Sequence, residues 1–86
     1  MYLEPHYPDI APCLVLPFEK DCTEGETGYP ALVFARRGRV ILFAAEYARR
    51  FGVGVLDHEG EVEASEQFPT LDMAARAFLN REAARA

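Results

Sequence analysis

The fold of this chain is decided by residues 31–44, which read ALVFARRGRVILFA. Two apolar runs, residues 31–35 and 40–44, flank a polar segment in which Gly38 can adopt the positive φ of a tight turn. The pattern predicts a β-hairpin. Both runs are apolar at every position, so we expect both faces of these strands to be covered, by a helix on one side and by another part of the chain on the other.

The segment after this hairpin predicts a second one. Residues 52–57 alternate small and apolar side chains, residues 58–60 (His-Glu-Gly) indicate a turn, and residues 61–66 alternate apolar and polar side chains. The last strand is expected to be half-exposed. Its predicted inward side chains are Val62 and Ala64, and its predicted outward ones are Glu61, Glu63 and Ser65.

Residues 46–50 are left open between helix and turn. Val40, Phe43, Tyr47 and Phe51 fall at helical spacing, and Gly52 could end a helix. The preference is for strand through about residue 45.

A helix is expected at the C-terminal end of the chain. Thr70 is a suitable N-cap, and Asp72 in the first turn complements the helix dipole. Asp72 and Arg76 form an i,i+4 pair, and Phe68 is expected to pack under the helix. The apolar stripe consists of Leu71, Ala75, Phe78 and Leu79.

The N-terminal third is harder to interpret. Residues 1–11 are expected to be an irregular arm, and residues 12–18 a short strand at a sheet edge, because Pro12 and Pro17 lack a backbone N–H. Residues 19–28 are polar and contain glycine, so they are predicted to form a mobile loop. The whole chain, residues 1–86, is expected to be a single α+β domain: a small antiparallel meander of four to five strands with one C-terminal amphipathic helix packed on one face.

The net charge of −5 is unevenly distributed. Residues 1–35 hold six acids and one lysine, residues 36–50 hold five arginines and one glutamate, and residues 57–86 hold seven acids and three arginines. A basic middle therefore lies between acidic ends. The first group of candidate binding residues is Arg36, Arg37, Arg39, Arg49 and Arg50. If the predicted strands pair, the first three lie at one end of a strand and the last two at its other end, which argues against one compact patch.

The acidic counterpart is the predicted last hairpin. Its candidate binding residues are Glu59, Glu61, Glu63 and Glu66. Such a stripe could imitate a nucleic-acid backbone toward an arginine-rich protein, although a plain solvated strand face is the preferred explanation.

Catalytic and metal chemistry have little support in the sequence. Two histidines and two cysteines, without a Cys-x-x-Cys pair, are too few for a typical zinc site, and no phosphate-binding glycine motif is present. We therefore predict no metal and no cofactor. Cys13 lies in an apolar stretch and is expected to be a buried free thiol. Cys22 and His58, in predicted loops, are the residues that a small enzyme would use.

The interpretation favoured by the sequence is a non-enzymatic module, a regulator or inhibitor that binds another protein. Its apolar content of 50% is high for a thin core, so a homodimer is also expected. The alternatives are a nucleic-acid-binding protein that uses the arginines of residues 36–50, and a small enzyme with a loop Cys/His site. The apolar runs are too short for a membrane helix and no secretory signal is evident, so a cytoplasmic location without membrane partners is expected.

Overall fold

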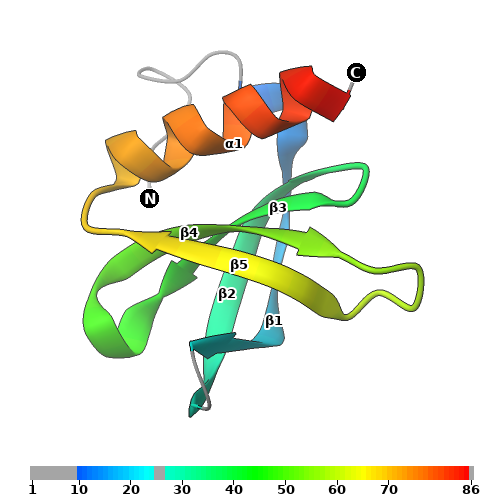
Figure 1. The fold of residues 1–86 in the computed structure, drawn as a ribbon. Helices are drawn as coiled ribbons and strands as arrows, with labels where there is room; N and C mark the ends of the chain where they lie inside the picture. Colours follow the sequence, from blue (N-terminus) through cyan, green and yellow to red (C-terminus); the bar gives the residue numbers. More distant parts are fainter. Residues whose placement is uncertain (1–9, 25–26, 86) are drawn as a thin grey trace.

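The computed structural model describes residues 10–24 and 27–85 of the chain (Figure 1). Five strands and one α-helix are joined by short connections, with two 3-10 turns, η1 and η2. In chain order the elements are η1 (Ala11–Cys13), β1 (Leu14–Glu24), β2 (Thr27–Arg37), β3 (Val40–Ala45), η2 (Glu46–Ala48), β4 (Arg50–Leu56), β5 (Val62–Phe68) and α1 (Leu71–Arg85).

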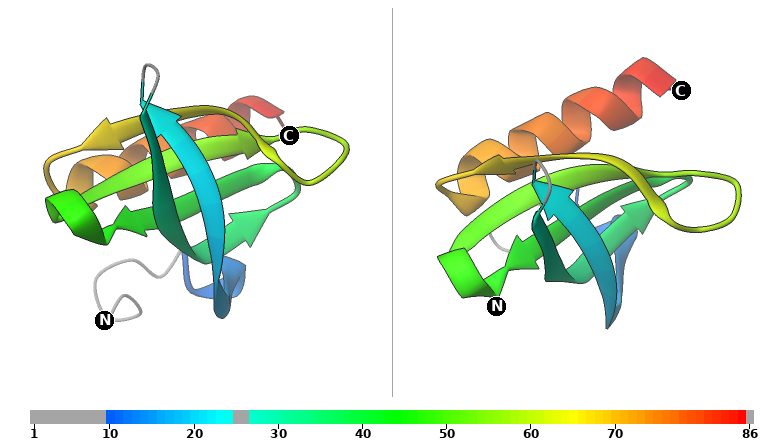
Figure 2. Two further views of the ribbon diagram at one scale, coloured as in Figure 1. Left: turned by 90° about the horizontal axis from the view of Figure 1, so that it is seen from below. Right: turned by 60° about the horizontal axis from the view of Figure 1, so that its bottom comes forward.

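The strands form one antiparallel meander in the order β1-β2-β3-β4-β5, and α1 packs on one face of it. This confirms the predicted α+β class and places β1 at an edge of the sheet, as its prolines indicate. The sheet is strongly bent: the long β1–β2 hairpin runs crosswise to β4 and β5, and β1 contacts β5 (Figure 2). Ser65 Oγ donates to the carbonyl of Thr23 at 3.5 Å across this contact.

Strand β3 lies at the centre, and all six of its residues are buried. Alternate side chains enter two separate cores, so the sheet is covered on both faces as the sequence predicts. The helix-side core consists of Ile10, Cys13, Phe34, Ala35, Val40, Leu42, Ala44, Val53, Ala74, Ala75 and Phe78. The hairpin-side core consists of Cys22, Tyr29, Ala31, Val33, Ile41, Phe43, Ala45 and Leu56. The face of the sheet opposite the helix is therefore covered by another part of the same bent sheet.

Irregular pairing accounts for the bend. The register between β1 and β2 shifts between Leu14 and Phe18, and that between β2 and β3 shifts between Val33 and Ala35. Extra residues in one strand increase its local twist and turn it out of the plane of the sheet. These shifts let the β1–β2 hairpin leave the helix-covered layer and close over the opposite face.

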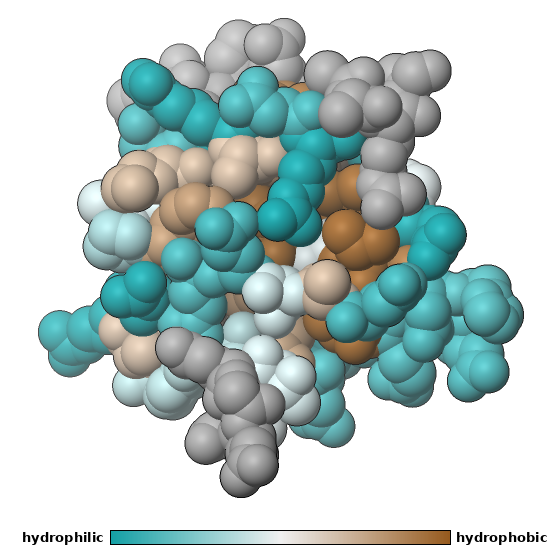
Figure 3. All heavy atoms as spheres, in the orientation of Figure 1, coloured by the Kyte–Doolittle hydropathy of each residue, from teal (hydrophilic) through white to brown (hydrophobic). Residues whose placement is uncertain are grey.

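The helix forms as the sequence predicts. Met73 N donates to Thr70 Oγ1 at 3.2 Å, which confirms the cap, and Arg76 Nε lies 3.2 Å from Asp72 Oδ2. Phe68 packs against the helix-side core beneath the start of α1. The space-filling view shows apolar side chains in a band between the helix and strands β4 and β5 (Figure 3). Within residues 10–24 and 27–85 there is no helix with the length and apolar content that a bilayer crossing requires.

Two predictions for the N-terminal third are wrong. The described part of residues 19–28 is not a loop, because residues 19–24 belong to β1 and residues 27–28 to β2. Exposed polar side chains lie between Phe18 and Cys22, which pack in the hairpin-side core or against it, a pattern that the high acid content conceals. The arm predicted over residues 1–11 ends earlier, since Ile10 is buried and η1 starts at Ala11; residues 1–9 lie outside the described part.

The open segment 46–50 resolves into three conformations. Residues 46–48 form η2, Arg49 adopts a left-handed conformation with φ of 52°, and β4 starts at Arg50. The left-handed residue ends the 3-10 turn and redirects the chain into the next strand. The preference for strand through residue 45 is confirmed, and residues 46–50 form no α-helix.

The facing predicted for β5 is right for Val62 and Glu63 but wrong for Ala64 and Ser65. Val55 pairs with Ala64 but Leu56 pairs with Val62, so one extra residue, Glu63, is inserted. Strand side chains alternate strictly, and one inserted residue moves all later side chains to the other face. Val62 therefore packs against the hairpin-side core, whereas Ala64 is exposed and Ser65 faces the β1–β2 hairpin.

Candidate groove on strands β1 and β2

Three consecutive apolar residues are exposed at the start of β1. Leu14 and Val15 are each 37% exposed and Leu16 is 89% exposed. The register shift between Leu14 and Phe18 interrupts regular pairing here, and Pro17 supplies no N–H to the sheet. Because α1 packs over β3, β4 and β5, it leaves this corner of the sheet uncovered.

A groove of about 310 Å³ adjoins these side chains on the helix-side face. Its facing follows from the register: Leu32 pairs with Ala44, a residue of the helix-side core, and cross-strand partners share a face. The lining residues are Leu14, Val15, Pro17, Leu32, Phe34, Ala44 and Glu46.

A second depression of about 250 Å³ continues the first, because Leu32 and Glu46 line both. Its lining residues are Glu19, Pro30, Ala31, Leu32, Glu46 and Tyr47. We call the two depressions together the β1–β2 groove. It is apolar at the Leu14 end and polar at the Tyr47 end.

The charge of the groove is negative. Glu19 enters from β1 and Glu46 from η2, and no lysine or arginine is among the lining residues. Within residues 10–24 and 27–85 neither carboxylate has an ion-pair partner. Lys20, the neighbour of Glu19, instead reaches Glu61, the residue before β5, with Nζ 4.0 Å from Oε2.

Tyr47 is held in place at the polar end. Its ring lies 5.1 Å from that of Tyr29, and Gln67 Nε2 donates to its hydroxyl at 3.1 Å. These contacts connect η2 to β2 and β5, so this wall of the groove is attached to both parts of the bent sheet.

The arginines named from the sequence divide into two groups, as the strand pattern predicts. Arg36, Arg37 and Arg39 surround the β2–β3 turn at Gly38, whereas Arg49 and Arg50 follow η2 at the other end of β3. Arg39 connects the β2–β3 turn to β4 and β5: its Nε donates to the carbonyl of Leu56 at 2.6 Å and its Nη2 lies 3.1 Å from Glu63 Oε2. Arg36 Nε donates to the carbonyl of Gly38 at 2.9 Å within the turn. The structure does not bring the five together.

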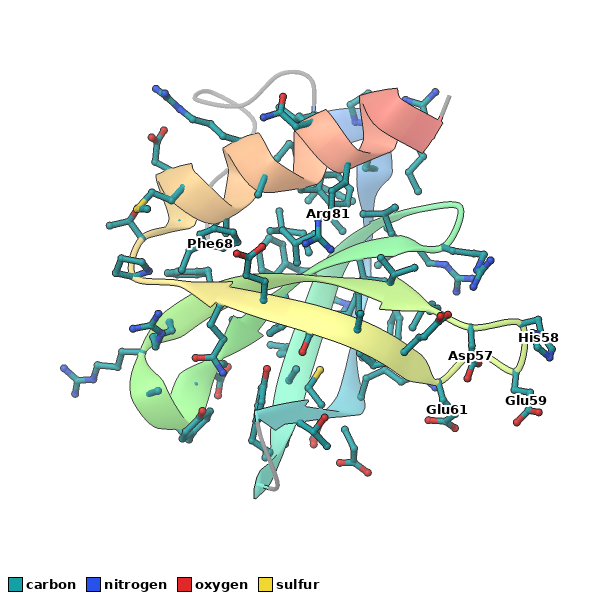
Figure 4. The ribbon with its side chains drawn as sticks, viewed as in Figure 1. Asp57, His58, Glu59, Glu61, Phe68 and Arg81 are labelled. Carbon is teal, nitrogen blue, oxygen red and sulfur yellow. The ribbon has the colours of Figure 1, made fainter. Side chains whose placement is uncertain are left out.

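The glutamates named from the sequence do not form a single acidic face. Glu63 pairs with Arg39, and Glu66 pairs with Arg81 of α1 at 3.1 Å. Figure 4 shows Arg81 directed from the helix toward β5, while Glu59 and Glu61 lie on and beside the β4–β5 turn. The extra residue at Glu63 directs Glu66 to the helix side, where Arg81 binds it.

Cys22 has the properties of a structural thiol. It is 1% exposed, and burial raises its pKa above the ordinary thiol value, an effect that a hydrogen bond with Tyr29 partly offsets. Thiolates, not thiols, are the nucleophiles, so this environment disfavours covalent chemistry. Cys13 is also buried, and both cysteines are free, as predicted for Cys13. Among the described residues, no three His, Cys, Asp or Glu side chains gather as metal ligands.

The β4–β5 turn is organised by Asp57. Its Oδ1 accepts the N–H groups of Glu61 at 3.0 Å and Glu59 at 2.8 Å, and Gly60 supplies a φ of 84°. The backbone hydrogen bond from Glu61, followed by that from Glu59, lowers the pKa of this carboxyl below its usual value of 3.8. This turn is far from the groove in sequence and has a structural role of its own.

Asp57→Ala is expected to lower the thermal unfolding midpoint at pH 7, because two turn N–H groups lose their acceptor. A carboxyl with a lowered folded pKa stabilises the fold above its unfolded pKa, and this contribution is lost as the pH falls through the folded pKa. The difference between wild type and variant should therefore shrink below about pH 4. Asp57→Asn, which keeps an oxygen acceptor, is the control and should lose less. Equal midpoints at pH 7 would contradict the assignment.

Comparisons with protein-family models, with curated proteins and with solved structures found no match to this chain. The candidate site therefore rests on its own geometry. Sequence analysis missed the groove residues Leu14, Val15 and Leu32. One signal was available: an apolar run flanked by prolines at a sheet edge is difficult to bury, and its side chains are candidates for contact with a partner.

Proposed function

We propose that this domain is a non-enzymatic module that binds another protein, as its regulator or inhibitor, through the β1–β2 groove. The observation that carries the proposal is the apolar surface of Leu14, Val15 and Leu16 beside a groove that α1 leaves uncovered. Contiguous exposed apolar surface on a small domain is a common mark of a protein interface. Among the described residues, the two cores bury most other apolar side chains, and Tyr47 and Met73 are the large apolar residues exposed elsewhere.

The buried state of Cys22 supports the non-enzymatic part of the proposal. A nucleophilic cysteine needs a lowered pKa and access to substrate, whereas Cys22 has a raised pKa and a closed environment. His58, the other residue that the enzyme alternative uses, lies on the exposed β4–β5 turn (Figure 4).

The test is variant-dependent binding. Proteins captured from the native cell by the tagged domain are identified, produced recombinantly and titrated against wild type, Val15→Glu and Met73→Glu. Val15 lines the groove, whereas Met73 is 46% exposed on α1 outside it. We expect Val15→Glu to weaken binding more than about tenfold, as for a central apolar contact, and Met73→Glu to have little effect. A partner that tolerates Val15→Glu, or none that binds directly, would overturn the proposal.

Nucleic-acid binding is the alternative function. Labelled DNA and RNA titrated at two salt concentrations would show affinity that falls steeply with salt if the arginines contact phosphates. The separation of Arg36, Arg37 and Arg39 from Arg49 and Arg50, and the pairing of Arg39 with Glu63, weigh against this outcome.

The expected homodimer stays a prediction, checked by light scattering across a dilution series. The groove is a poor choice for its interface. A symmetric dimer joins the same patch of both copies, so Glu19 and Glu46 of each copy would be brought to one interface without cations. We therefore place a different protein in the groove.

A further inference from the structure

Resting on the proposed function, we propose that the β1–β2 groove takes a partner segment in which an apolar side chain is followed closely by a lysine or arginine, held by side-chain insertion and not by strand addition. The apolar side chain enters the depression bounded by Leu14, and the cation enters the depression bounded by Tyr47.

The apolar end defines the first half of this recognition. Of the residues that line the first depression, only Glu46 is charged, and the rest are apolar. Leu32 and Phe34 come from β2, while Leu14, Val15 and Pro17 form a wall from β1. Such a lining favours an apolar side chain, because inserting one removes apolar surface from water on both molecules.

The polar end defines the second half. Glu19 and Glu46 approach it from different elements, and within the described residues neither has an intramolecular cation. The same domain pairs Glu61, Glu63 and Glu66 with Lys20, Arg39 and Arg81. Three other glutamates of the domain are thus paired internally, whereas the groove holds two carboxylates and no cation among its lining residues. Complementary charge on the partner supplies the missing cation.

The edge of β1 excludes strand addition at this point. An added strand needs a regular row of free N–H and C=O groups. Here Pro17 provides no N–H, and the register shift between Leu14 and Phe18 disrupts the row. Bulges and prolines are the usual means by which an edge strand avoids pairing with another chain. The groove must therefore be recognised through side chains.

The test uses phage that display random 12-residue peptides, selected against the immobilised wild-type domain. We expect the enriched sequences to carry Leu, Ile, Phe or Met within four residues of Lys or Arg. The best synthetic peptide and its Lys/Arg→Glu counterpart are then titrated. Each exposed ion pair contributes about a two- to fivefold difference in affinity.

Charge reversal in the domain makes the result specific to the groove. Glu19→Lys and Glu46→Lys should each weaken binding of the basic peptide and strengthen binding of its acidic counterpart. The basic peptide should not bind the Val15→Glu variant. Glu59→Lys is the matched control, because it makes the same charge change on the exposed β4–β5 turn. Equal weakening by Glu59→Lys would reduce the effect to net charge and overturn the proposal. Enrichment of acidic or uncharged sequences, or no enrichment, would also overturn it.

The two proposals fail differently. If a native partner binds and Val15→Glu abolishes its binding, the proposed function stands even when Glu19→Lys and Glu46→Lys have no effect, and only the basic character of the partner is wrong. If the basic peptides bind as expected but no native protein requires Val15, the groove has the proposed chemistry and the proposed function fails.

Discussion

Gly52→Ala is expected to destabilise the domain by about 3 kcal/mol or more, at the upper end of the cost of overpacking a core. A Cβ at this position would overlap the ring of Phe43 and lie 2.8 Å from the carbonyl oxygen of Glu66. Phe43 pairs with Gly52 across β3 and β4 and is fully buried, so its ring has no free space to enter. The contact with the Glu66 backbone on β5 closes the other side. Urea unfolding followed by circular dichroism measures the effect.

Gly28→Ala is the matched control for this substitution. Gly28 is also a strand glycine, but a Cβ there would lie 3.8 Å from the carbonyl oxygen of Cys22, an ordinary contact. Its expected effect is below about 1 kcal/mol and can be stabilising, since alanine reduces the freedom of the unfolded chain. In a double variant, Gly52→Ala with Phe43→Leu, the phenylalanine ring that the new Cβ overlaps is absent. This variant should regain the part of the unfolding free energy lost to that overlap, but not the part lost to the contact with the Glu66 carbonyl. Similar stabilities for the two single glycine variants would refute the assigned contact.

Phe78→Ala is expected to cost about 3–5 kcal/mol, the usual range for a buried phenylalanine. Phe78 is fully buried and is the largest side chain that α1 contributes to the helix-side core. Among the helix residues whose burial the structure describes, the other buried ones are Ala74 and Ala75, which are small, and Leu71 and Leu79 are only partly buried against the core. Total stabilities of small domains are about 5–15 kcal/mol, so the variant should lie near its unfolding threshold.

Met73→Ala provides the comparison within the same helix. Met73 is an exposed apolar residue of α1, and its loss should change the free energy of unfolding by about 0.5 kcal/mol or less. Chemical denaturation of both variants separates the effect of docking from that of helix propensity, because alanine is the best helix former in each. A loss of less than about 1 kcal/mol for Phe78→Ala would mean that the helix contributes little to the fold.

Local patterns predicted the elements that depend on neighbours in sequence. The hairpin around Gly38, the Thr70 cap and the Asp72–Arg76 pair are present as expected. Burial of β3 on both faces was also predictable, because its six residues have no polar face to expose. Each of these features is decided by a few adjacent side chains.

Residues 19–24 show where this reasoning fails. Their acids indicate a loop, yet they complete β1, because the β1–β2 hairpin bends across the sheet and buries Cys22 against Tyr29 and Phe43. The extra residue at Glu63 was likewise not predictable from local patterns. It reverses the facing of Ala64, Ser65 and Glu66, and no neighbouring residue signals it. Both errors concern contacts between segments far apart in sequence.

The candidate groove depends on the same long-range geometry. Leu14, Val15 and Leu32 are ordinary strand residues in the sequence, and nothing in it indicates that α1 covers β3–β5 but not β1 and β2. The arginines that the sequence does highlight are divided between the two ends of β3, and Glu61, Glu63 and Glu66 are paired within the domain.

The sequence by itself determined the class of this domain, an antiparallel meander with one C-terminal helix, because strand alternation, turns and helix caps are local physical preferences. The tertiary structure decided how the sheet bends, which side chains are left uncovered, and which carboxylates lack a cation. Those properties follow from where bulges turn the strands and from which elements meet across the fold, and residues distant in sequence set them jointly.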